Sequence, residues 1–215
     1  MKIHRALISV SDKTGLIPFA KRLNDLGVEI LSTGGTAKAI SDEGIPVIEI
    51  SDYTNAPEMF DGRLKTIHPK VHGGLLFRRD HPEDPEQAEK NDIPPIDLLI
   101  VNLYPFEKTI AKEGVELEEA IENIDIGVPA MLGAASKNYK SVTVITDIND
   151  YDVVADEMEE TGGETSLKTR ERLAIKVFLR TGSYDQTIGN FLNKSQETDS
   201  GYSVSLPLAS ELRYG

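Results

Sequence analysis

The sequence predicts an α/β protein with a central, mainly parallel sheet of about five strands and a helical extension at the C-terminal end. Short apolar runs alternate with stretches in which apolar residues recur at helical spacing, which is typical of buried strands covered by helices. Polar or glycine-containing turns follow the first two runs. The expected strands are residues 5–10, 28–32, 45–50, 97–103 and 141–146.

Residues 5–10 form the first apolar run, and residues 11–15 form a polar turn behind it. Proline is tolerated only near the first turn of a helix, so Pro18 places the helix start near Thr14. Gly27 is expected to stop this helix. A strand, a polar turn and a helix N-terminus together make an arrangement that can bind an anion.

The same pattern repeats directly afterwards. Residues 28–32 are expected as a strand, residues 33–36 as a glycine turn, and residues 37–43 as a short helix that ends at Gly44. Paired glycines let the backbone approach a ligand and direct successive N–H groups at a phosphate. Each turn alone is equally compatible with a connection that binds nothing. Two such turns after neighbouring strands favour phosphate binding.

Residues 61–74 contain three cationic side chains, two imidazoles, one hydroxyl and three glycines. We expect a loop outside the core here, because apolar periodicity is weak and Pro69 disfavours a helix. Such a loop suits an anionic substrate and would place Lys65 beside it. His68 and His72 have a spacing that suits a metal on a helix, but Pro69 between them argues against that helix.

The fourth expected strand is the most apolar, and it places Asn102 and Tyr104 at its carboxyl end, where parallel sheets bind ligands. Residues 82–95 are expected as an acidic surface excursion with a short helix. Further helices are expected over residues 117–123, 130–136, 151–160 and 167–192. The last has an apolar face for packing on the sheet or on a partner subunit, formed by Leu173, Val177, Tyr184, Ile188 and Phe191.

Composition narrows the function classes. A formal net charge of -13 argues against a nucleic-acid binder, although a few basic groups in a cleft can still hold a small phosphorylated ligand. The sequence has no cysteine, which excludes disulfides, thiolate nucleophiles and cysteine-type zinc sites. No signal segment opens the chain, and no apolar run reaches the roughly 18 residues of a membrane span. These features indicate a cytoplasmic protein.

Five ordered motifs resemble the N-terminal inosine monophosphate (IMP) cyclohydrolase domain of the bifunctional purine-biosynthesis family PurH. They are residues 9–16 (SVSDKTGL), 33–38 (TGGTAK), 62–69 (GRLKTIHP), 102–106 (NLYPF) and 124–127 (IDIG). The resemblance covers residues 3–194 and implies a three-layer methylglyoxal-synthase-like fold. Its core is expected over residues 1–148, a helical extension over 149–194, and a linker with the start of a missing transformylase domain over 195–215.

The resemblance implies the last step to IMP, in which 5-formamidoimidazole-4-carboxamide ribotide (FAICAR) closes its ring and loses water. The positions carried over as catalytic are Lys65, Tyr104, Asp125 and Lys137. We expect Lys65 to stabilise the oxyanion and Asp125 to accept a proton or orient the carboxamide. Lys137 is expected as a second cation or proton donor, and Tyr104 as a donor or ring-packing group. Asp125 as a helix cap and Tyr104 as a structural aromatic remain alternatives.

The resemblance also assigns the residues that hold the substrate. Hydroxyls, an ammonium and backbone donors are expected at the phosphate, and further groups at the ribose and base. The substrate-binding positions are Ser9, Ser11, Lys13, Thr33, Gly34, Gly35, Thr36, Arg63, Thr66, Asn102, Ile126 and Gly127. No metal or other cofactor is expected for this step, since 10-formyltetrahydrofolate would belong to the absent second domain. A homodimer is expected, with no nucleic-acid or membrane partner.

The sequence departs from the family near the expected purine end. Val128 and Ala130 replace a glycine and a small hydroxylic residue, while Gly133 and Tyr139 replace a common arginine and histidine. Valine does not readily adopt a positive φ, so contacts to the purine and the turnover rate are in question. Two alternatives share the fold, namely a methylglyoxal synthase acting on a triose phosphate and a nucleotide-sensing module such as that of carbamoyl phosphate synthetase.

Overall fold

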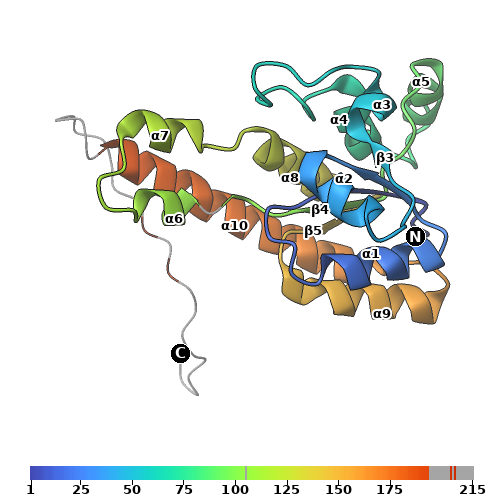
Figure 1. The fold of residues 1–215 in the computed structure, drawn as a ribbon. Coiled ribbons are helices and arrows are strands. Elements are labelled where there is room, and N and C mark those ends of the chain that lie inside the picture. The colour runs from blue at the N-terminus through green and yellow to red at the C-terminus, as the bar shows by residue number, and fades with distance from the viewer. Residues whose placement is uncertain (105, 194–203, 205, 207–215) are drawn as a thin grey trace. The chain divides into compact units, whose positions relative to one another are not determined.

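A computed structural model of the chain describes residues 1–104, 106–193, 204 and 206 (Figure 1). The chain forms two compact units. The first contains Met1–Tyr104 and Asp125–Phe178, and the second contains Pro105–Ile124 and Leu179–Gly215. The expected domain boundaries near residues 148 and 194 remain predictions. Apart from residues 204 and 206, the expected linker and second-domain start lie outside the described residues.

The first unit is built on a five-stranded sheet in which every neighbouring pair is parallel, as predicted. Its strand order is β3-β2-β1-β4-β5. The chain moves outward from β1 to β3 and then restarts on the other side with β4, so the order reverses between β1 and β4. Ligands of open parallel sheets bind at such a point. The strands are β1 (Arg5–Ser9), β2 (Glu29–Ser32), β3 (Ile48–Glu49), β4 (Leu98–Val101) and β5 (Thr143–Ile145).

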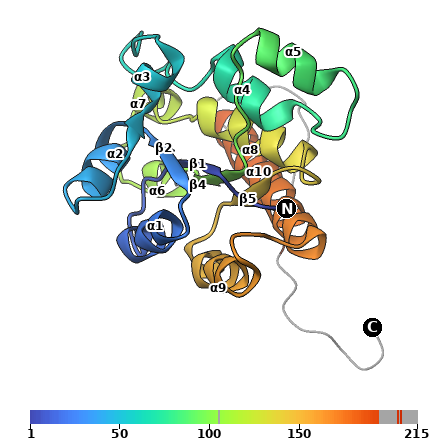
Figure 2. The ribbon, with the colours of Figure 1, turned by 90° about the vertical axis from the view of Figure 1, so that its right-hand side faces the viewer.

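The strands are apolar because both faces of the sheet are covered. Ala6, Leu7 and Ile8 are fully buried, and all four residues of β4 are buried as well. Figure 2 shows α1 and α9 side by side below the sheet, with α4 and α8 above it. This is the expected three-layer arrangement. The helices of the unit are α1 (Leu16–Asp25), α2 (Gly34–Ser41), α3 (Ile50–Thr54), α4 (Pro69–Leu76), α5 (Asp84–Lys90), α8 (Gly127–Lys137), η1 (Ile148–Asp150), α9 (Tyr151–Thr161) and the first part of α10 (Leu167–Asn193).

Helix α1 follows the prediction. Pro18 is its third residue. A proline fits there because the backbone N–H groups of the first turn have no acceptor within the helix. Gly15 precedes the helix with a φ of 70°, and Gly27 follows it with a φ of 75°, so both ends use a backbone conformation that favours glycine.

Helix α2 begins earlier than predicted. The expected turn at residues 33–36 is the start of the helix itself, because the Thr33 carbonyl accepts hydrogen bonds from the N–H groups of Thr36 (3.0 Å) and Ala37 (3.1 Å). Gly34 and Gly35 therefore occupy its first turn. The third strand is also shorter than expected, since the chain turns into α3 at Ile50.

The prediction that residues 61–74 are entirely a loop outside the core is wrong. Pro69 is the first residue of α4, where a proline fits because the N–H at that position has no intrahelical acceptor. His68 caps this helix, and its Nδ1 accepts a hydrogen bond from the Lys70 N–H at 3.1 Å. Val71 and Leu75 are fully buried, so α4 supplies part of the core.

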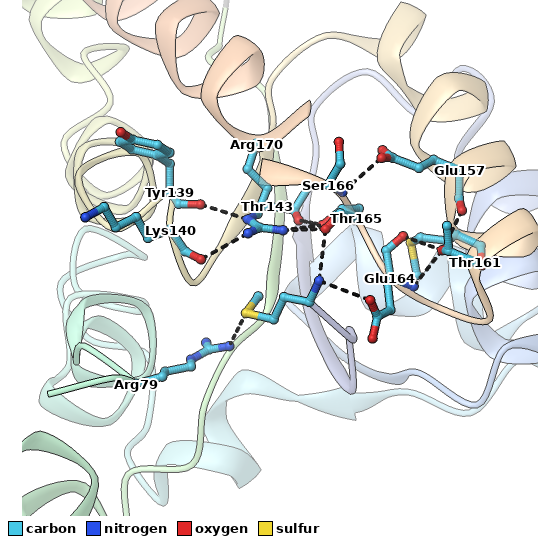
Figure 3. A network of polar contacts seen from close by, with 12 residues as sticks. Arg79, Tyr139, Lys140, Thr143, Glu157, Thr161, Glu164, Thr165, Ser166 and Arg170 are labelled. Carbon is cyan, nitrogen blue, oxygen red and sulfur yellow. Dashed lines mark hydrogen bonds and ion pairs between the residues drawn. The ribbon is translucent and has the colours of Figure 1, made fainter. Parts of the chain in front are cut away.

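Polar groups near the amino ends of β1, β4 and β5 are hydrogen-bonded within the protein, and Figure 3 shows the contacts around Arg170 and Thr165. The carboxylate of Asp97 accepts hydrogen bonds from the backbone N–H groups of His4 (2.8 Å) and Arg5 (2.9 Å) and forms an ion pair with Arg79. Arg170 donates to the carbonyls of Tyr139 (2.9 Å), Lys140 (3.2 Å) and Thr165. We call these residues the amino-end network.

The second unit contains α6 (Phe106–Ile110), α7 (Leu117–Glu122) and the later part of α10. Phe106 packs edge-on against Tyr184 and Phe191, with ring-centroid distances of 6.3 and 5.7 Å. Helix α6 was not predicted, whereas α7 and α10 lie within one residue of their expected ranges. No helix in the described part of the chain is both long and apolar enough to cross a membrane.

Candidate functional site

A cleft with a volume of about 290 Å³ opens at the carboxyl ends of β2, β1 and β4. It therefore lies at the point where the strand order reverses, as expected for a ligand site in a parallel sheet. Three loops and the N-termini of α2 and α8 form its walls. The lining residues are Ser9, Val10, Ser11, Lys13, Thr33, Gly34, Gly35, Thr36, Lys65, Asn102, Tyr104, Asp125 and Val128.

The N-terminus of α2 forms part of the wall of this cleft. The N–H groups of Gly34 and Gly35 have no hydrogen-bond acceptor among the described residues. A Cβ added to Gly34 would lie 3.3 Å from the Nζ of Lys65, and one added to Gly35 would lie 4.0 Å from the Nζ of Lys13. Two ammonium groups thus lie beside a helix N-terminus, which favours a dianion such as a phosphate monoester.

Two threonine side chains hold this wall in place. The Oγ1 of Thr36 accepts from the Val10 N–H (3.1 Å) and donates to the Val10 carbonyl (3.0 Å). Its own N–H already donates to Thr33, so Thr36 orients the wall and offers neither polar group to a phosphate. The hydroxyls of Ser9 and Thr33 lie 2.6 Å apart and share one hydrogen bond. These bonds give Thr36 a positioning role in the wall, and its expected contact with the substrate stays a prediction.

Asn102 has a similar role in the turn after β1. Its Oδ1 accepts from both the N–H and the Oγ of Ser11 at 2.7 Å, and its Nδ2 donates to the Asp12 carbonyl at 3.3 Å. The side chain joins the ends of β1 and β4 and fixes the turn that carries Lys13. Asn102 lines the cleft as expected, with its amide oxygen occupied by Ser11.

Asp125, Tyr104 and Val128 line the other side of the cleft. The Oδ1 of Asp125 accepts a hydrogen bond from the Val128 N–H at 2.9 Å, so this side chain, one residue before the N-cap residue Ile126, satisfies an N–H of the first turn of α8, and the structural and catalytic readings of Asp125 are compatible. Burial raises the pKa of its carboxyl group, and hydrogen bonds from the Val128 and Gly127 backbones partly offset this. Val128 has no positive φ, so its substitution for glycine is compatible with the helix start.

The segment that carries Lys65 spans the two helix N-termini. Lys65 lies beside Gly34 at the start of α2, while the Oγ1 of Thr66 would lie 3.1 Å from a Cβ on Gly127 at the start of α8. Thr66 is buried, and it touches the α8 side without lining the cavity. The neighbouring residues Thr66 and Lys65 thus connect the carboxylate side of the cleft with its cationic side.

Besides Thr66, four expected residues are not among those that line this cleft, namely Arg63, Ile126, Gly127 and Lys137. Arg63 and Ile126 are exposed. Lys137 is exposed in the last turn of α8, nine residues beyond Val128, which at a rise of about 1.5 Å per residue corresponds to about 14 Å along the helix axis. The structure therefore does not bring Lys137 together with Lys65 and Asp125, and its catalytic role stays a prediction.

No cluster of three or more potential metal ligands occurs among the described residues. His68 caps α4 through Nδ1, which explains its spacing from His72 without a metal. Burial lowers the pKa of His72. Sequence reasoning missed Val10, which lines the cleft, and Glu58, which does not line it but forms an ion pair with the lining residue Lys65. The Asp61-Gly62 dipeptide, a signal for a two-residue hairpin turn, could have indicated that the chain folds back there.

Comparisons with known proteins agree with this geometry. Residues 15–130 match the family model of the MGS-like domain, and residues 135–215 match that of the AICARFT/IMPCHase bienzyme. Among solved structures, the chain is similar to ForH, with 33% sequence identity and a TM-score of 0.76, over 87% of this chain and 97% of that chain. The chain belongs to the MGS-like domain family and is a PurH-like domain of the IMP cyclohydrolase type.

Proposed function

We propose that this protein is an IMP cyclohydrolase that converts FAICAR to IMP. One observation carries the proposal: a single cleft has a helix N-terminus with two ammonium groups on one side and a partly buried carboxyl group with a phenol on the other. The first side suits the 5′-phosphate of a ribotide, and the second suits proton transfer at its heterocycle.

The phosphate would bind at the start of α2. The N–H groups of Gly34 and Gly35 donate to its oxygens, and Lys13 neutralises its charge. Ser11 is the first residue of the neighbouring turn, and Asn102 holds that turn in place. Because Ser9, Thr33 and Thr36 bond one another or the backbone, the wall is organised before the ligand arrives. Such preorganisation reduces the ordering cost of binding.

The heterocycle would then face Asp125 and Tyr104. The carboxamide nitrogen attacks the formyl carbon, a C–N bond forms, and the formyl oxygen gains negative charge. Asp125 accepts the proton that leaves the nitrogen, and its raised pKa makes it a stronger base than an exposed aspartate. Tyr104 donates to the developing oxyanion. The oxygen then takes up this proton and a second one from the former formamide nitrogen, and it leaves as water while the C=N bond of the purine ring forms.

Lys65 has two compatible roles. The resemblance assigns it to the oxyanion, yet its Nζ lies beside Gly34 on the phosphate side. Loss of an oxyanion donor lowers kcat, whereas loss of a phosphate contact that is equal in the ground and transition states raises KM. Holding both arms of FAICAR in a near-attack geometry would supply a further share of the rate, up to about 7–11 kcal/mol in model reactions.

The ring closure uses side chains and bound water alone, with no metal or organic cofactor. The protein acts in the cytoplasm as a homodimer on a small-molecule nucleotide, with no nucleic-acid or membrane partner.

The test is to incubate the protein with FAICAR and follow the purine absorbance of IMP. We expect turnover, and a decrease in kcat/KM of at least about a hundredfold in Lys65→Ala, as for loss of an oxyanion-hole donor. Lys38→Ala is the matched control, because Lys38 is exposed on α2 and pairs with Asp42 at 3.0 Å. No purine formation by the wild-type protein would refute the proposal.

Two outcomes would instead support the alternatives. Conversion of dihydroxyacetone phosphate to methylglyoxal would identify a methylglyoxal synthase. Tight binding of IMP without turnover of FAICAR would identify a nucleotide sensor.

A further inference from the structure

Lys65 is carried by a short β-hairpin that the sequence reasoning did not predict. The N–H groups of Met59 and Leu64 donate to each other's carbonyls at 3.0 and 3.2 Å, which makes an isolated antiparallel bridge. The Arg63 N–H donates to the Phe60 carbonyl at 3.1 Å and closes a four-residue turn. Phe60, Asp61 and Gly62 in the connection between the bridged residues all have a positive φ, a conformation that glycine and aspartate adopt more readily than most residues.

The register of this hairpin sets Glu58 opposite Lys65. Since Met59 pairs with Leu64, the next pair outward is Glu58 with Lys65, and residues directly opposite in such a ladder have Cβ atoms about 5 Å apart. The two side chains form an ion pair through Glu58 Oε2 and Lys65 Nζ. Glu58 thus holds the ammonium group that reaches Gly34.

Gly62 leaves room for this arrangement. A Cβ on Gly62 would lie 2.7 Å from the other oxygen of Glu58, Oε1, which is closer than real Cβ contacts come. The turn, the register and the ion pair together therefore determine where the Lys65 Nζ lies.

The cleft contains a competing partner for Lys65. Of the described residues that line it, Asp125 carries the only carboxylate, and the other titratable groups there are Lys13, Lys65 and Tyr104. A lysine side chain is long and flexible. Without Glu58, the Lys65 ammonium can move toward Asp125, and an ammonium beside a carboxylate favours its ionised form and weakens it as a base.

We propose that Glu58 is a positioning residue that holds the Lys65 ammonium at the start of α2 and away from Asp125. This inference rests on the proposed cyclohydrolase function, since it explains how one cleft keeps a cation and a base in separate roles. Glu58 touches neither the phosphate nor the reacting atoms in this account.

The first test compares Glu58→Ala, Glu58→Gln and Glu58→Asp in the FAICAR assay. A side chain displaced by about 1 Å can lower a rate by about a hundredfold, so we expect kcat/KM to fall about ten- to a hundredfold in Glu58→Ala. Glu58→Asp should recover part of the loss. Glu119→Ala is the matched control, because Glu119 forms an ion pair with Lys112 at 3.0 Å and neither residue lines the cleft.

Two further readouts separate positioning from a general structural role. Glu58→Ala should have no further effect in a Lys65→Ala background, because the two residues act through one group. The acidic limb of the kcat–pH profile should move to lower pH in Glu58→Ala, because the displaced ammonium lowers the pKa of Asp125. An equal loss in both backgrounds, or an unchanged rate and pH profile, would overturn the inference.

A crystal structure of Glu58→Ala gives a readout that does not depend on turnover. We expect the Lys65 Nζ to leave Gly34, and an Nζ that stays there overturns the proposal. If the wild-type protein makes no purine from FAICAR, the proposed function fails, while this structure still decides the role of Glu58.

Discussion

The two ends of the sheet use polar groups in opposite ways. At the amino ends of the strands, Asp97 is 3% exposed, and its carboxylate accepts from two backbone N–H groups and pairs with Arg79. At the carboxyl ends, the N–H groups of Gly34 and Gly35 have no acceptor among the described residues. The polar groups at the amino ends are therefore bonded within the protein, whereas the two N–H groups at the carboxyl ends can donate to a ligand.

The difference shows at which end of a parallel sheet backbone N–H groups can stay without a hydrogen-bond partner in the protein. An unsatisfied polar group is costly only where water cannot reach it. The amino-end network is buried, so each of its charges needs a partner within the protein. The cleft is open to solvent, so water can hydrate the α2 N-terminus until an anion replaces it. Stability and binding should therefore respond separately to substitutions at the two ends.

The largest effect is expected from Asp125→Asn at the carboxyl end. Asparagine keeps an oxygen that can cap α8 but cannot accept a proton, so kcat should fall by about 10²–10⁴-fold, the range for general acid–base catalysis. Steady-state kinetics measure this change, and circular dichroism checks the fold. An undiminished kcat would remove Asp125 from the chemistry.

The same residue predicts a pH dependence. Burial raises the pKa of Asp125, so its protonated form is favoured in the folded protein. Its stabilising contribution is present below the ordinary aspartate pKa and is lost as the pH rises through the raised value. At neutral pH, Asp125→Asn should therefore unfold at an equal or slightly higher temperature than the wild type, and kcat should fall as the pH drops through the same raised pKa.

At the amino end, Asp97→Ala should lower the free energy of unfolding by about 3–5 kcal/mol, the cost of breaking a buried ion pair. The Arg79 guanidinium and two backbone N–H groups would lose their acceptor. Urea unfolding measures the change, with Asp42→Ala as the control, since its exposed pair with Lys38 should contribute at most about 1 kcal/mol. Folded Asp97→Ala should keep the wild-type KM, and a raised KM would contradict the separation of the two ends.

A smaller effect is expected for Lys13→Ala. A hydrogen bond to a charged group contributes about 1.5–3 kcal/mol, so the affinity for IMP should fall by about ten- to 150-fold with little change in unfolding temperature. Calorimetric titration with IMP measures the affinity. Lys21→Ala is the control, because Lys21 is an exposed lysine on α1, the helix that follows Lys13 in the chain. Equal affinities for the two variants would place the phosphate elsewhere.

The smallest effect is expected for Thr36→Val. Thr36 lines the cleft, yet its hydroxyl is hydrogen-bonded within the fold. Valine leaves the buried Val10 N–H and carbonyl without their present partner, so the free energy of unfolding should fall by about 1–3 kcal/mol. Thermal and urea unfolding measure it, and Thr36→Ser serves as the control that retains the hydroxyl. Loss of IMP binding without loss of stability would indicate instead that Thr36 contacts the phosphate directly.

The fold followed from local sequence patterns. Apolar runs and helical periodicity predicted five strands and a parallel α/β sheet, because burial on both faces leaves a continuous apolar signal. Pro69 was misjudged because a proline that ends a helix and one that begins it look alike until the cap is known. Here His68 supplies that cap, and burial of Val71 and Leu75 stabilises the helix.

The cleft was predicted only in part. Motifs identified residues near strand ends, yet they did not show which polar groups bind the protein itself. The bond between Thr36 and Val10 joins residues 26 apart, and the pair of Glu58 with Lys65 depends on a hairpin register. The position of Lys137 depends on the length and direction of α8. Such contacts are set by tertiary geometry, which a linear pattern does not encode.

The most direct test is a crystal structure with IMP bound. We expect the phosphate oxygens within about 3 Å of the N–H groups of Gly34 and Gly35, and the purine facing Asp125 and Tyr104. A nucleotide whose phosphate lies at the α8 side, or outside the cleft at the carboxyl ends of the strands, would contradict the account.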